Sequence, residues 1–430
     1  MEVKKQRTLA NETPNNRQWL LLQLPLGEAA QTFNLETAVC SHGLFAMAPN
    51  RWDPLSKTFS RPLQLTLHHD RQTSKSVMVR ISQPQEQRHC LHIRVLAETG
   101  FLDPEHEQEL LAQVSRMLRL SETDERIAGE FLEVYAPAGC LSIGRVFRSP
   151  TLFEDMVKCM LLCNCRWPRT LDMAQALCDL QLELQEQFPY FAPKTPAGKE
   201  SKKPPAEQTK VELESCTNDI AMNSTRTTFE NLSDSCEEVC EAYSVLVCDY
   251  DRIGNFPTPI ELAKLDENFL AKRCKLGYRA SRIVKLARGI VEGKIQLNQM
   301  EETCIDRSLC SYSKLAEQLR QIDGFGPFTC ANVLMCMGFY HVIPTDSETI
   351  RHLKQVHGRK STIQTIEKDV EKLYSKYAPF QFLAYWSELW NFYQERFGKF
   401  SEIPCSGYKL VTASNMRCKT SRQNKRKKRL

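Results

Sequence analysis

The chain has 430 residues, of which 42% are hydrophobic and 25% are charged, so it can bury a sizeable core and form about two or three domains. Its apolar runs fall short of the ~20 residues that a membrane span needs, and we expect a soluble protein with no membrane partner. The formal net charge is +5, but residues 417–430 alone carry eight Lys or Arg and no acidic residue. The remainder is therefore slightly acidic, and the net charge does not indicate where a nucleic acid would bind.

The 18 cysteines raise the hypotheses of a disulfide framework and of a zinc site. Spacings such as Cys163-x-Cys165 and Cys330-x5-Cys336 do not form the paired C-x-x-C sets that hold structural zinc, and the chain is too long for a small disulfide-stapled domain. We expect reduced, mostly buried thiols in a nuclear or cytosolic protein. The polar N-terminus has no apolar signal core, which argues against secretion and leaves an organellar presequence open.

The first part of the chain predicts a sheet. Residues 1–17 are polar and predict a flexible N-terminus, whereas residues 18–102 contain short alternating or β-branched apolar runs between polar turns. These runs are Trp19–Leu26, Leu63–Leu67, Val77–Ile81 and Leu91–Leu96. We therefore predict an antiparallel sheet domain over 18–102, with a short helix capped by Asn34.

Helical spacing begins at residue 103, and residues 103–192 predict the first part of a helical domain. Within it, residues 150–188 predict two amphipathic helices separated around Pro168. Residues 193–242 are rich in Pro, Lys, Ser and Thr and predict a disordered insertion. Helical patterning then resumes over 243–400, with a helix start at Pro259.

The predicted fold class is therefore α+β, an N-terminal antiparallel sheet domain followed by a mostly helical domain that the insertion splits. The final residues, 401–430, are basic and poor in apolar residues, and they predict a tail.

The most informative stretch runs from Leu319 to Leu353 and reads as helix, tight hairpin, helix, loop and helix. Gly324-Phe325-Gly326 allows a sharp reversal of the backbone. Pro327 then suits the first position of a helix, because its fixed φ matches and its missing N–H would be unpaired there anyway. A helix N-terminus beside exposed hairpin amides can bind phosphate without reading base sequence. The alternative is an ordinary turn.

Asp346 follows the hairpin in the segment Ile343-Pro344-Thr345-Asp346, where it begins another helix. A carboxylate fixed at such a place can stabilise positive charge that develops in a reaction and can orient water. We expect the helix dipole to keep Asp346 ionised. The structural alternative is that Thr345 to Glu348 form only a capping box.

The ordered pair of hairpin and Pro-x-Asp resembles the signature of the helix-hairpin-helix (HhH-GPD) DNA glycosylases with a Gly/Pro-rich loop and a catalytic aspartate. Phe153-Glu154, Leu276-Gly277-Tyr278-Arg279-Ala280 and the Trp386 segment follow in the family's order, so the resemblance covers most of residues 18–400. It implies that Asp346 is catalytic and that Gly324, Phe325 and Gly326 position the DNA backbone.

The resemblance also implies roles for an exposed group of polar residues. Asn164, Arg169, Tyr278 and Arg279 match the positions with which 8-oxoguanine glycosylases fill the vacated stack and contact the orphaned base. Base flipping leaves a hole and an unpaired partner, which such side chains can occupy. The alternative is solvated arginines and a packed tyrosine.

For the base pocket, the resemblance points to Phe328, Glu388 and Phe392. Phe328 stands where bifunctional relatives carry a Schiff-base lysine and where relatives acting on alkylated bases carry an aromatic residue. It either faces a flipped base or packs in the core. Glu388 replaces the base-reading Gln of 8-oxoguanine glycosylases, and Phe392 matches their stacking Phe. Aromatic residues at this spacing also suit a core.

The function implied is a monofunctional DNA glycosylase of base excision repair that flips a damaged base and hydrolyses its N-glycosidic bond. The alternatives are a catalytically inactive helix-hairpin-helix DNA-binding protein and an interaction scaffold using the insertion and tail. The expected partner is double-stranded DNA with a damaged base, and the expected state is a monomer. The basic tail predicts nuclear localisation.

No cofactor is expected to be required. The resemblance implies a monovalent cation, K⁺ or Na⁺, held by backbone carbonyls of Gly324 and Gly326. An iron-sulfur cluster is not expected, because only Cys405 and Cys418 fall in the region where some relatives carry four cysteines.

Overall fold

The structure is a computed structural model that describes residues 18–66, 74–97, 102–135, 144–187 and 253–418. Residues 1–184 and 253–430 group into one compact unit, which contains the sheet and almost all of the described helices. Of the other unit, residues 185–252, only the last turn of one helix is described. In the part of the chain that the structure describes, no helix is both long and apolar enough to cross a bilayer.

The predicted antiparallel sheet is present and has five strands in the order β1-β5-β4-β3-β2. Its strands are β1 (Gln18–Pro25), β2 (Arg51–Asp53), β3 (Thr58–Thr66), β4 (Ser74–Ser82) and β5 (Cys90–Ala97). Ile93 of β5 pairs with Leu22 on one side and with Ile81 on the other. All three are buried, because alternate residues of a strand point to the same face. The three-residue β2 was not predicted.

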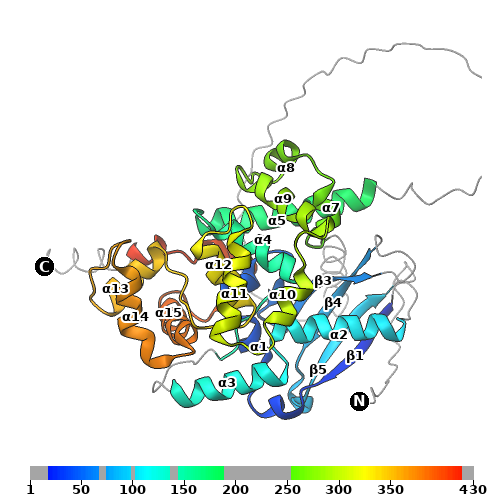
Figure 1. Ribbon diagram of the computed structural model, residues 1–430. Helices are drawn as coiled ribbons and strands as arrows, with labels where there is room; N and C mark the ends of the chain where they lie inside the picture. Colours follow the sequence, from blue (N-terminus) through cyan, green and yellow to red (C-terminus); the bar gives the residue numbers. More distant parts are fainter. Residues whose placement is uncertain (1–17, 67–73, 98–101, 136–143, 188–252, 419–430) are drawn as a thin grey trace, which may run out of the picture. The chain divides into compact units, whose positions relative to one another are not determined.

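One face of the sheet contacts α2 (Pro104–Leu118) through β3 (Figure 1). The helix begins where the change of periodicity placed it, and the Asp103 side chain accepts a hydrogen bond from the His106 amide at 2.8 Å. Leu110, Val114 and Met117 are buried along one stripe of this helix. The next helix, α3 (Glu122–Val134), was not predicted.

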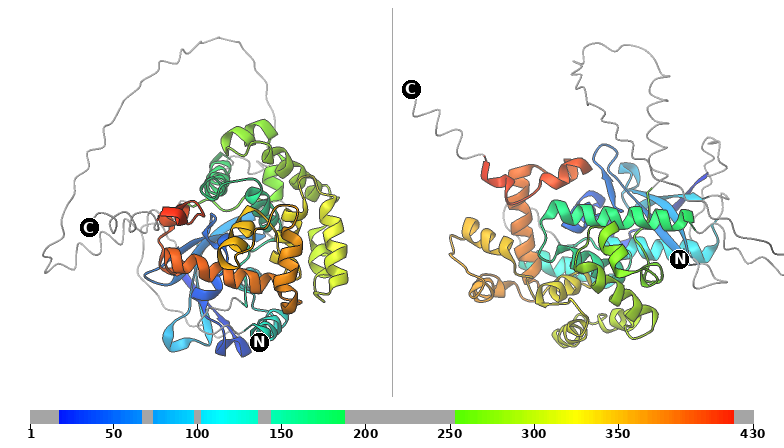
Figure 2. Two further views of the ribbon diagram at one scale, coloured as in Figure 1. Left: turned by 90° about the vertical axis from the view of Figure 1, so that its left-hand side faces the viewer. Right: turned by 90° about the horizontal axis from the view of Figure 1, so that it is seen from above.

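The remaining helices form the helical part of the unit. They are α1 (Leu35–Val39), α4 (Leu152–Leu162), α5 (Trp167–Gln187), α7 (Pro259–Ala263), α8 (Glu267–Arg273), α9 (Arg279–Val291), α10 (Leu297–Thr303), α11 (Leu309–Arg320), α12 (Pro327–Cys336), α13 (Ser347–Val356), α14 (Ile366–Tyr374) and α15 (Gln381–Phe397). Helices α7 and α8 each contact α9, and the three helices, coloured light green, lie together in both views of Figure 2.

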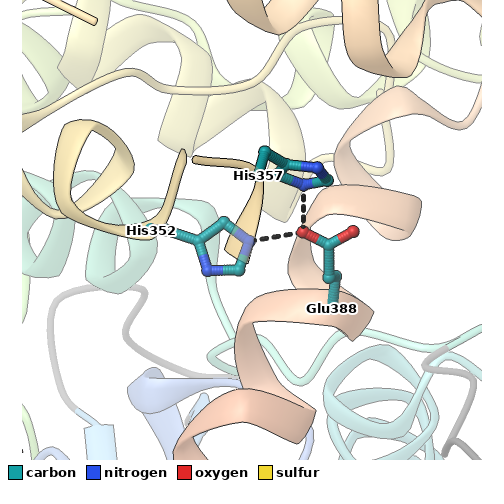
Figure 3. Close-up of side chains that lie close together, drawn as sticks. All are labelled: His352, His357 and Glu388. Atoms are coloured by element: carbon teal, nitrogen blue, oxygen red, sulfur yellow. Dashed lines mark hydrogen bonds and ion pairs between the residues drawn. The ribbon is translucent and has the colours of Figure 1, made fainter. Parts of the chain in front are cut away.

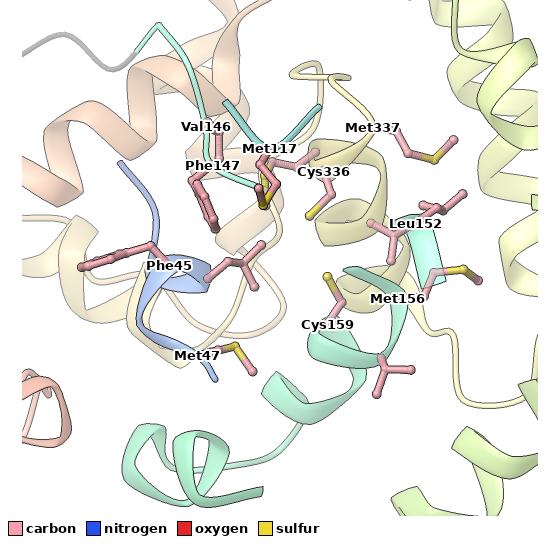
Figure 4. Packing of buried hydrophobic residues seen from close by; sticks show 14 of the residues in the cluster. Phe45, Met47, Met117, Val146, Phe147, Leu152, Met156, Cys159, Cys336 and Met337 are labelled. Carbon is pink, nitrogen blue, oxygen red and sulfur yellow. The ribbon is translucent and has the colours of Figure 1, made fainter. Parts of the chain in front are cut away.

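Helices α4 and α12 contact each other in the core. Every residue of α4 from Leu152 to Leu161 is buried, so α4 is a central helix and the prediction of an amphipathic helix here is wrong. Figure 4 shows the Cys159 thiol of α4 facing the Cys336 thiol of α12. Burial and this neighbour raise the pKa of Cys159 well above its usual value, as expected for a reduced structural thiol.

A buried ion pair joins the sheet to α4. Arg61 of β3 donates two hydrogen bonds to Glu154, at 3.1 and 2.9 Å, and Lys158 lies 2.7 Å from the same carboxylate. Arg61 and Lys158 have no exposed surface. Burial alone would raise the pKa of Glu154, but the two cations lower it to about 2. Glu154 therefore stays ionised inside an apolar helix because the sheet supplies its counter-charge.

Two predicted boundaries differ from the structure. Pro168 does not separate α4 from α5, because it lies in the first turn of α5, where its missing N–H is harmless. The tail predicted from residue 401 begins with folded chain, since the indole nitrogens of Trp52 and Trp167 donate to the carbonyls of Ser401 and Tyr408. The predicted insertion, 193–242, lies outside the described residues.

Candidate functional site

The hairpin between α11 and α12 is built around two different glycines. Gly324 has a left-handed backbone, with φ of +91°, and a Cβ there would come within 2.5 Å of the Arg282 side chain. Gly326 has φ of −78°, and a Cβ there would meet nothing within 4 Å. Sterics within the fold therefore require glycine at 324 but not at 326, and the prediction that both glycines are needed for the turn is wrong for Gly326.

Phe325 anchors the hairpin from beneath. Its side chain is 4% exposed, and its amide donates to the Ile322 carbonyl at 3.1 Å. Gly326 and Pro327 are exposed at the start of α12, and no side chain caps the first turn of this helix. The N-terminus of α12 therefore presents its amides to solvent, as a phosphate-binding helix does.

Two cationic side chains of α9 flank the hairpin. Lys285 lies 3.0 Å and Arg282 lies 3.7 Å from the Asp323 carboxylate, which precedes Gly324. Each is partly exposed, so each can also face a second anion. The exposed amides and these two cations give the hairpin a positive surface.

The group predicted to fill the stack lies beside the hairpin. Tyr278 is 50% exposed, and the guanidinium of Arg282 lies over its ring at 4.8 Å. Arg169 is exposed and donates to the Lys275 carbonyl at 3.3 Å. Asn164 is exposed in a left-handed conformation, with φ of +47°, which Asn tolerates better than most residues.

Arg279 is buried, unlike the other three residues of this group, which are exposed. It is 4% exposed, its guanidinium lies over the Tyr278 ring at 4.6 Å, and it donates a hydrogen bond to the Cys163 carbonyl. The thiol of Cys163 is 3.0 Å from the Thr329 hydroxyl of α12. In this structure Arg279 therefore joins the loop that carries Asn164 to α9, and it does not extend from the surface as expected of a base-contacting arm.

Asp346 is fixed at the N-terminus of α13. Its carboxylate accepts hydrogen bonds from the amide and the hydroxyl of Thr349, at 2.9 and 3.1 Å, and that hydroxyl accepts from the Asp346 amide at 3.3 Å. The Thr349 hydroxyl also lies 3.0 Å from the buried hydroxyl of Tyr385. The capping box therefore pairs Asp346 with Thr349, whereas the predicted box from Thr345 to Glu348 is shifted by one residue.

The pKa of Asp346 is raised above its ordinary value, although the residue begins a helix. Its side chain reaches solvent while protein atoms surround it on most sides, and this loss of hydration outweighs the two bonds from Thr349, which act in the opposite direction. The nearby Glu348 carboxylate adds to the increase. A carboxylate that is accessible, fixed in direction and poorly hydrated is suited to stabilise a developing cation.

Glu348, beside Asp346, takes part in a hydrogen-bonded group that the sequence did not reveal. Arg351 Nε donates to both of its oxygens at 2.8 Å, and the Tyr393 hydroxyl donates to it at 2.5 Å. The Arg351 guanidinium also lies over the ring of Phe392 at 5.3 Å. Phe392 is thus half-buried between Arg351 and its own helix, and is not part of a sealed core.

Phe328 lies in the first turn of α12 and is half-buried. It is outside the hydrophobic cluster that the described residues form. Its carbonyl accepts a hydrogen bond from the Asn332 side chain at 2.9 Å. This position favours an accessible ring over the alternative of core packing.

Glu388 is held through one of its two carboxylate oxygens. One of its oxygens accepts hydrogen bonds from His352 and His357, each at 2.6 Å, and from the Tyr374 hydroxyl at 2.9 Å. Figure 3 shows both imidazoles directed at this oxygen. Burial raises the pKa of Glu388, but its histidine and tyrosine partners lower the pKa by more than burial raises it, so the net shift is downward. Partners from α13 and α14 thus engage one oxygen of the carboxylate, and the pocket role of Glu388 stays a prediction.

The monovalent cation implied at the hairpin stays a prediction. The Gly326 carbonyl already accepts the Cys330 amide at 3.0 Å. A carbonyl oxygen has two lone pairs, so this bond is compatible with a cation ligand. The chemistry of the hairpin therefore fits a cation, which would add positive charge facing a phosphate.

Comparison with known proteins finds a family model that matches part of this chain. Residues 220–378 match the model of the HhH-GPD superfamily base excision DNA repair proteins. The N-glycosylase/DNA lyase of Saccharomyces cerevisiae (strain ATCC 204508 / S288c) is 26% identical over 149 residues, which are 33% of this chain and 38% of the yeast protein. The match thus spans less than half of that relative.

Two solved structures are similar over most of the chain. MBOgg1 in complex with a low-affinity DNA ligand has a TM-score of 0.46 and 15% identity, covering 90% of this chain and 97% of that chain. The 3-methyladenine DNA glycosylase from Archaeoglobus fulgidus has a TM-score of 0.44 and 13% identity, and the match covers 85% of this chain and 98% of that chain. Residues 220–378, in which the hairpin, α12 and Asp346 lie, are therefore the part of the chain that is similar to the HhH-GPD superfamily of base excision DNA repair proteins.

Proposed function

We propose that this protein is a DNA glycosylase of base excision repair that removes a damaged base from double-stranded DNA. The observation that carries the proposal is the Asp346 carboxylate, which is accessible, fixed by Thr349 and poorly hydrated. It follows, in the same domain, a hairpin whose helix presents uncapped amides. The yeast relative, which is named as an N-glycosylase/DNA lyase, supports the same activity.

In the proposed reaction, the hairpin and α12 bind a phosphate next to the lesion, and Arg282 and Lys285 add charge beside them. Tyr278, Asn164 and Arg169 are exposed next to this surface and fill the space that the extruded base leaves. Asp346 then stabilises the positive charge that develops on the sugar as the N-glycosidic bond breaks.

We further propose that water is the nucleophile and that the strand stays intact. A lyase needs an amine that forms an imine with the sugar, and Phe328 offers none. Lys314 and Lys354 are exposed on α11 and α13, and Lys158 is buried in its ion pair with Glu154. None of these three is in the first turn of α12, where the bifunctional enzymes that the sequence resembles place their amine.

A catalytically inactive DNA-binding protein is the second candidate. It is favoured by the engagement of Glu388 with His352 and His357, which occupies one oxygen of the expected base-reading group. In this case, the hairpin would still bind duplex DNA while no base is released. Asp346, held with its carboxylate accessible, favours the enzyme.

The test is an excision assay on end-labelled duplexes, each with one modified base from the oxidised, alkylated and deaminated classes. We expect release of at least one base, leaving an abasic site that breaks only after alkali. Tight binding to the duplexes with no release from any of them would support the inactive binder instead.

Borohydride trapping on the preferred duplex decides the nucleophile. We expect no covalent adduct between protein and DNA, because no amine attacks the sugar. An adduct that disappears in Lys354→Gln, but persists in Lys314→Gln, would place the protein among the bifunctional enzymes.

A further inference from the structure

Two histidines and one glutamate meet where α13, α14 and α15 come together. His352 lies in the last turns of α13, His357 is the residue that ends this helix, and Glu388 lies on α15. Nε2 of each histidine is 2.6 Å from the same oxygen of Glu388. One ligand atom from each of the three residues lies within 4.8 Å of the other two (Figure 3).

The arrangement is crowded for a hydrogen-bonded cluster. Three groups, His352, His357 and the Tyr374 hydroxyl, approach a single carboxylate oxygen. An oxygen of this kind has about two lone-pair directions, so one donor approaches along a poor direction. His352 and His357 approach from α13 and its C-terminal end, and Glu388 approaches from α15, so the three side chains converge on one point as the ligands of a metal ion do.

We propose that His352, His357 and Glu388 bind one divalent transition-metal ion, with Zn²⁺ as the ion that best fits their two imidazoles and one carboxylate. This ligand set leaves a fourth tetrahedral position, as zinc sites with three protein ligands do. Tyr374 lies 3.2 Å from His357 Nε2 and 2.9 Å from the Glu388 oxygen, so its hydroxyl or a water can take that position.

The site must rearrange to hold the ion, because the Glu388 oxygen is too near both histidine nitrogens and the three ligand atoms span up to 4.8 Å. Zinc bonds of ~2.0–2.2 Å separate neighbouring tetrahedral ligand atoms by ~3.3–3.5 Å, whereas the present separation of each Nε2 from the Glu388 oxygen is 2.6 Å. The carboxylate must therefore withdraw by less than about 1 Å. Glu388 is on a flexible stem and is 27% exposed at its side chain, so it has room to move.

The tautomer of His352 limits how tightly the ion is held. Binding through Nε2 places the imidazole proton on Nδ1, and this atom is buried without a hydrogen-bond partner among the described residues. Zinc histidines usually donate that proton to a carbonyl or carboxylate. We therefore expect an ion that a chelator removes without unfolding the protein.

The proposed ion would act on the helix that carries Asp346. Asp346, Thr349 and His352 are spaced at i, i+3 and i+6, so they follow one face of α13. An ion at the far end of this face would join α13 to α15 and restrict the movement of the helix. This inference does not depend on the proposed glycosylase activity, because it concerns metal binding alone.

The test is titration of the full-length, metal-free protein with Co²⁺, followed by visible absorption, and with Zn²⁺, followed by calorimetry. We expect one ion per chain and the d–d bands of nitrogen and oxygen ligands, without the charge-transfer bands of cysteine thiolates. His357→Gln and Glu388→Gln should weaken binding at least about tenfold. Both residues are only half-buried, so circular dichroism should show intact folds.

The matched control is His92→Gln, because His92 is a partly exposed histidine of the sheet outside the cluster. Its affinity for Co²⁺ should equal that of the unaltered protein. A protein that binds no ion, a thiolate spectrum, or equal affinity in His357→Gln and the control would each overturn the proposal. Each of these outcomes leaves the excision assay unaffected, so the two proposals fail separately.

Discussion

At the residue scale, we expect substitutions of Gly324 and Gly326 to have different effects, although both residues belong to one hairpin. Gly324 has φ of +91°, and a side chain there also approaches Arg282. Gly324→Ala should therefore destabilise the fold by about 1–3 kcal/mol through backbone strain. The free energy of unfolding in urea measures this loss directly.

Gly326→Val is the matched variant, because its backbone is unstrained and its Cβ meets open space. We expect it to unfold like the unaltered protein yet to bind every duplex more weakly, since a side chain there keeps a phosphate from the amides of α12. Fluorescence anisotropy on two unrelated duplexes tests this. Unchanged affinity would show that DNA does not approach the backbone at Gly326.

The environment of Asp346 predicts how activity depends on pH. Desolvation raises its pKa, and the amide and hydroxyl of Thr349 oppose that increase. Because the ionised form is the active one, excision should fall as the pH drops through this raised pKa. In Thr349→Val one of the opposing bonds is lost, so the acidic limb of the rate profile should move to higher pH.

Single-turnover rates across pH, for the unaltered protein and Thr349→Val, provide the measurement. Thr349 is fully buried and valine has a similar shape. The main effect of the substitution should therefore be a shift of the acidic limb along the pH axis, with little change in the maximal rate at high pH. A limb that stays in place, or moves to lower pH, would show that Thr349 does not tune Asp346.

At the element scale, the ion pair between β3 and α4 makes a prediction about stability. Glu154→Gln leaves Arg61 and Lys158 buried without a counter-charge, which should cost about 3–5 kcal/mol. The folded-state pKa of Glu154, about 2, is below its ordinary value of 4.5. Its contribution to stability is therefore complete above pH 4.5 and is lost as the pH falls towards 2.

Urea unfolding at several pH values checks both parts. The difference in the free energy of unfolding between the unaltered protein and Glu154→Gln should be largest near neutral pH and should become smaller in acid. A difference that does not depend on pH would mean that Glu154 stabilises the fold by packing and not by its charge.

The elements that the sequence predicted best are those with a local cause. Alternating apolar residues predicted β3, β4 and β5, and the change to helical spacing at residue 103 predicted the start of α2. The hairpin and the start of α12 were predicted because glycine permits the sharp turn at Gly324 and proline fixes φ at Pro327. Strand β2 has three residues, which is too short for a periodic pattern to be recognised.

The parts of the site that the sequence did not reveal depend on contacts between distant residues. Glu388 meets His352 and His357, which are 36 and 31 positions away. Arg279 reaches the Cys163 carbonyl, 116 positions away. No local pattern carries such pairings, so the sequence placed Glu388 in a pocket and Arg279 on the surface.

At the scale of the whole molecule, the basic C-terminal segment predicts how DNA binding responds to salt. Residues 425–429 are all Lys or Arg, and each one that contacts a phosphate contributes up to about 0.9 to the slope of log affinity against log salt. Deletion of residues 424–430 should flatten this slope for non-specific duplexes, while excision at low salt is retained. We propose that the same segment directs the protein to the nucleus.

Affinity measured at several salt concentrations, together with the location of tagged full-length and truncated proteins in cells, provides the test. An unchanged slope and unchanged localisation would remove both roles from the segment. Loss of excision at low salt would instead show that residues 424–430 contribute to the site.

The central claim is that the accessible carboxylate of Asp346 performs the chemistry while the hairpin binds DNA. Asp346→Asn tests it most directly, because asparagine caps a helix as well as aspartate does and removes only the charge. Single-turnover excision should fall by about 10²–10³-fold, and affinity for the same duplex should stay unchanged. Excision at the rate of the unaltered protein would contradict the account, and so would a loss of DNA binding equal to the loss of excision.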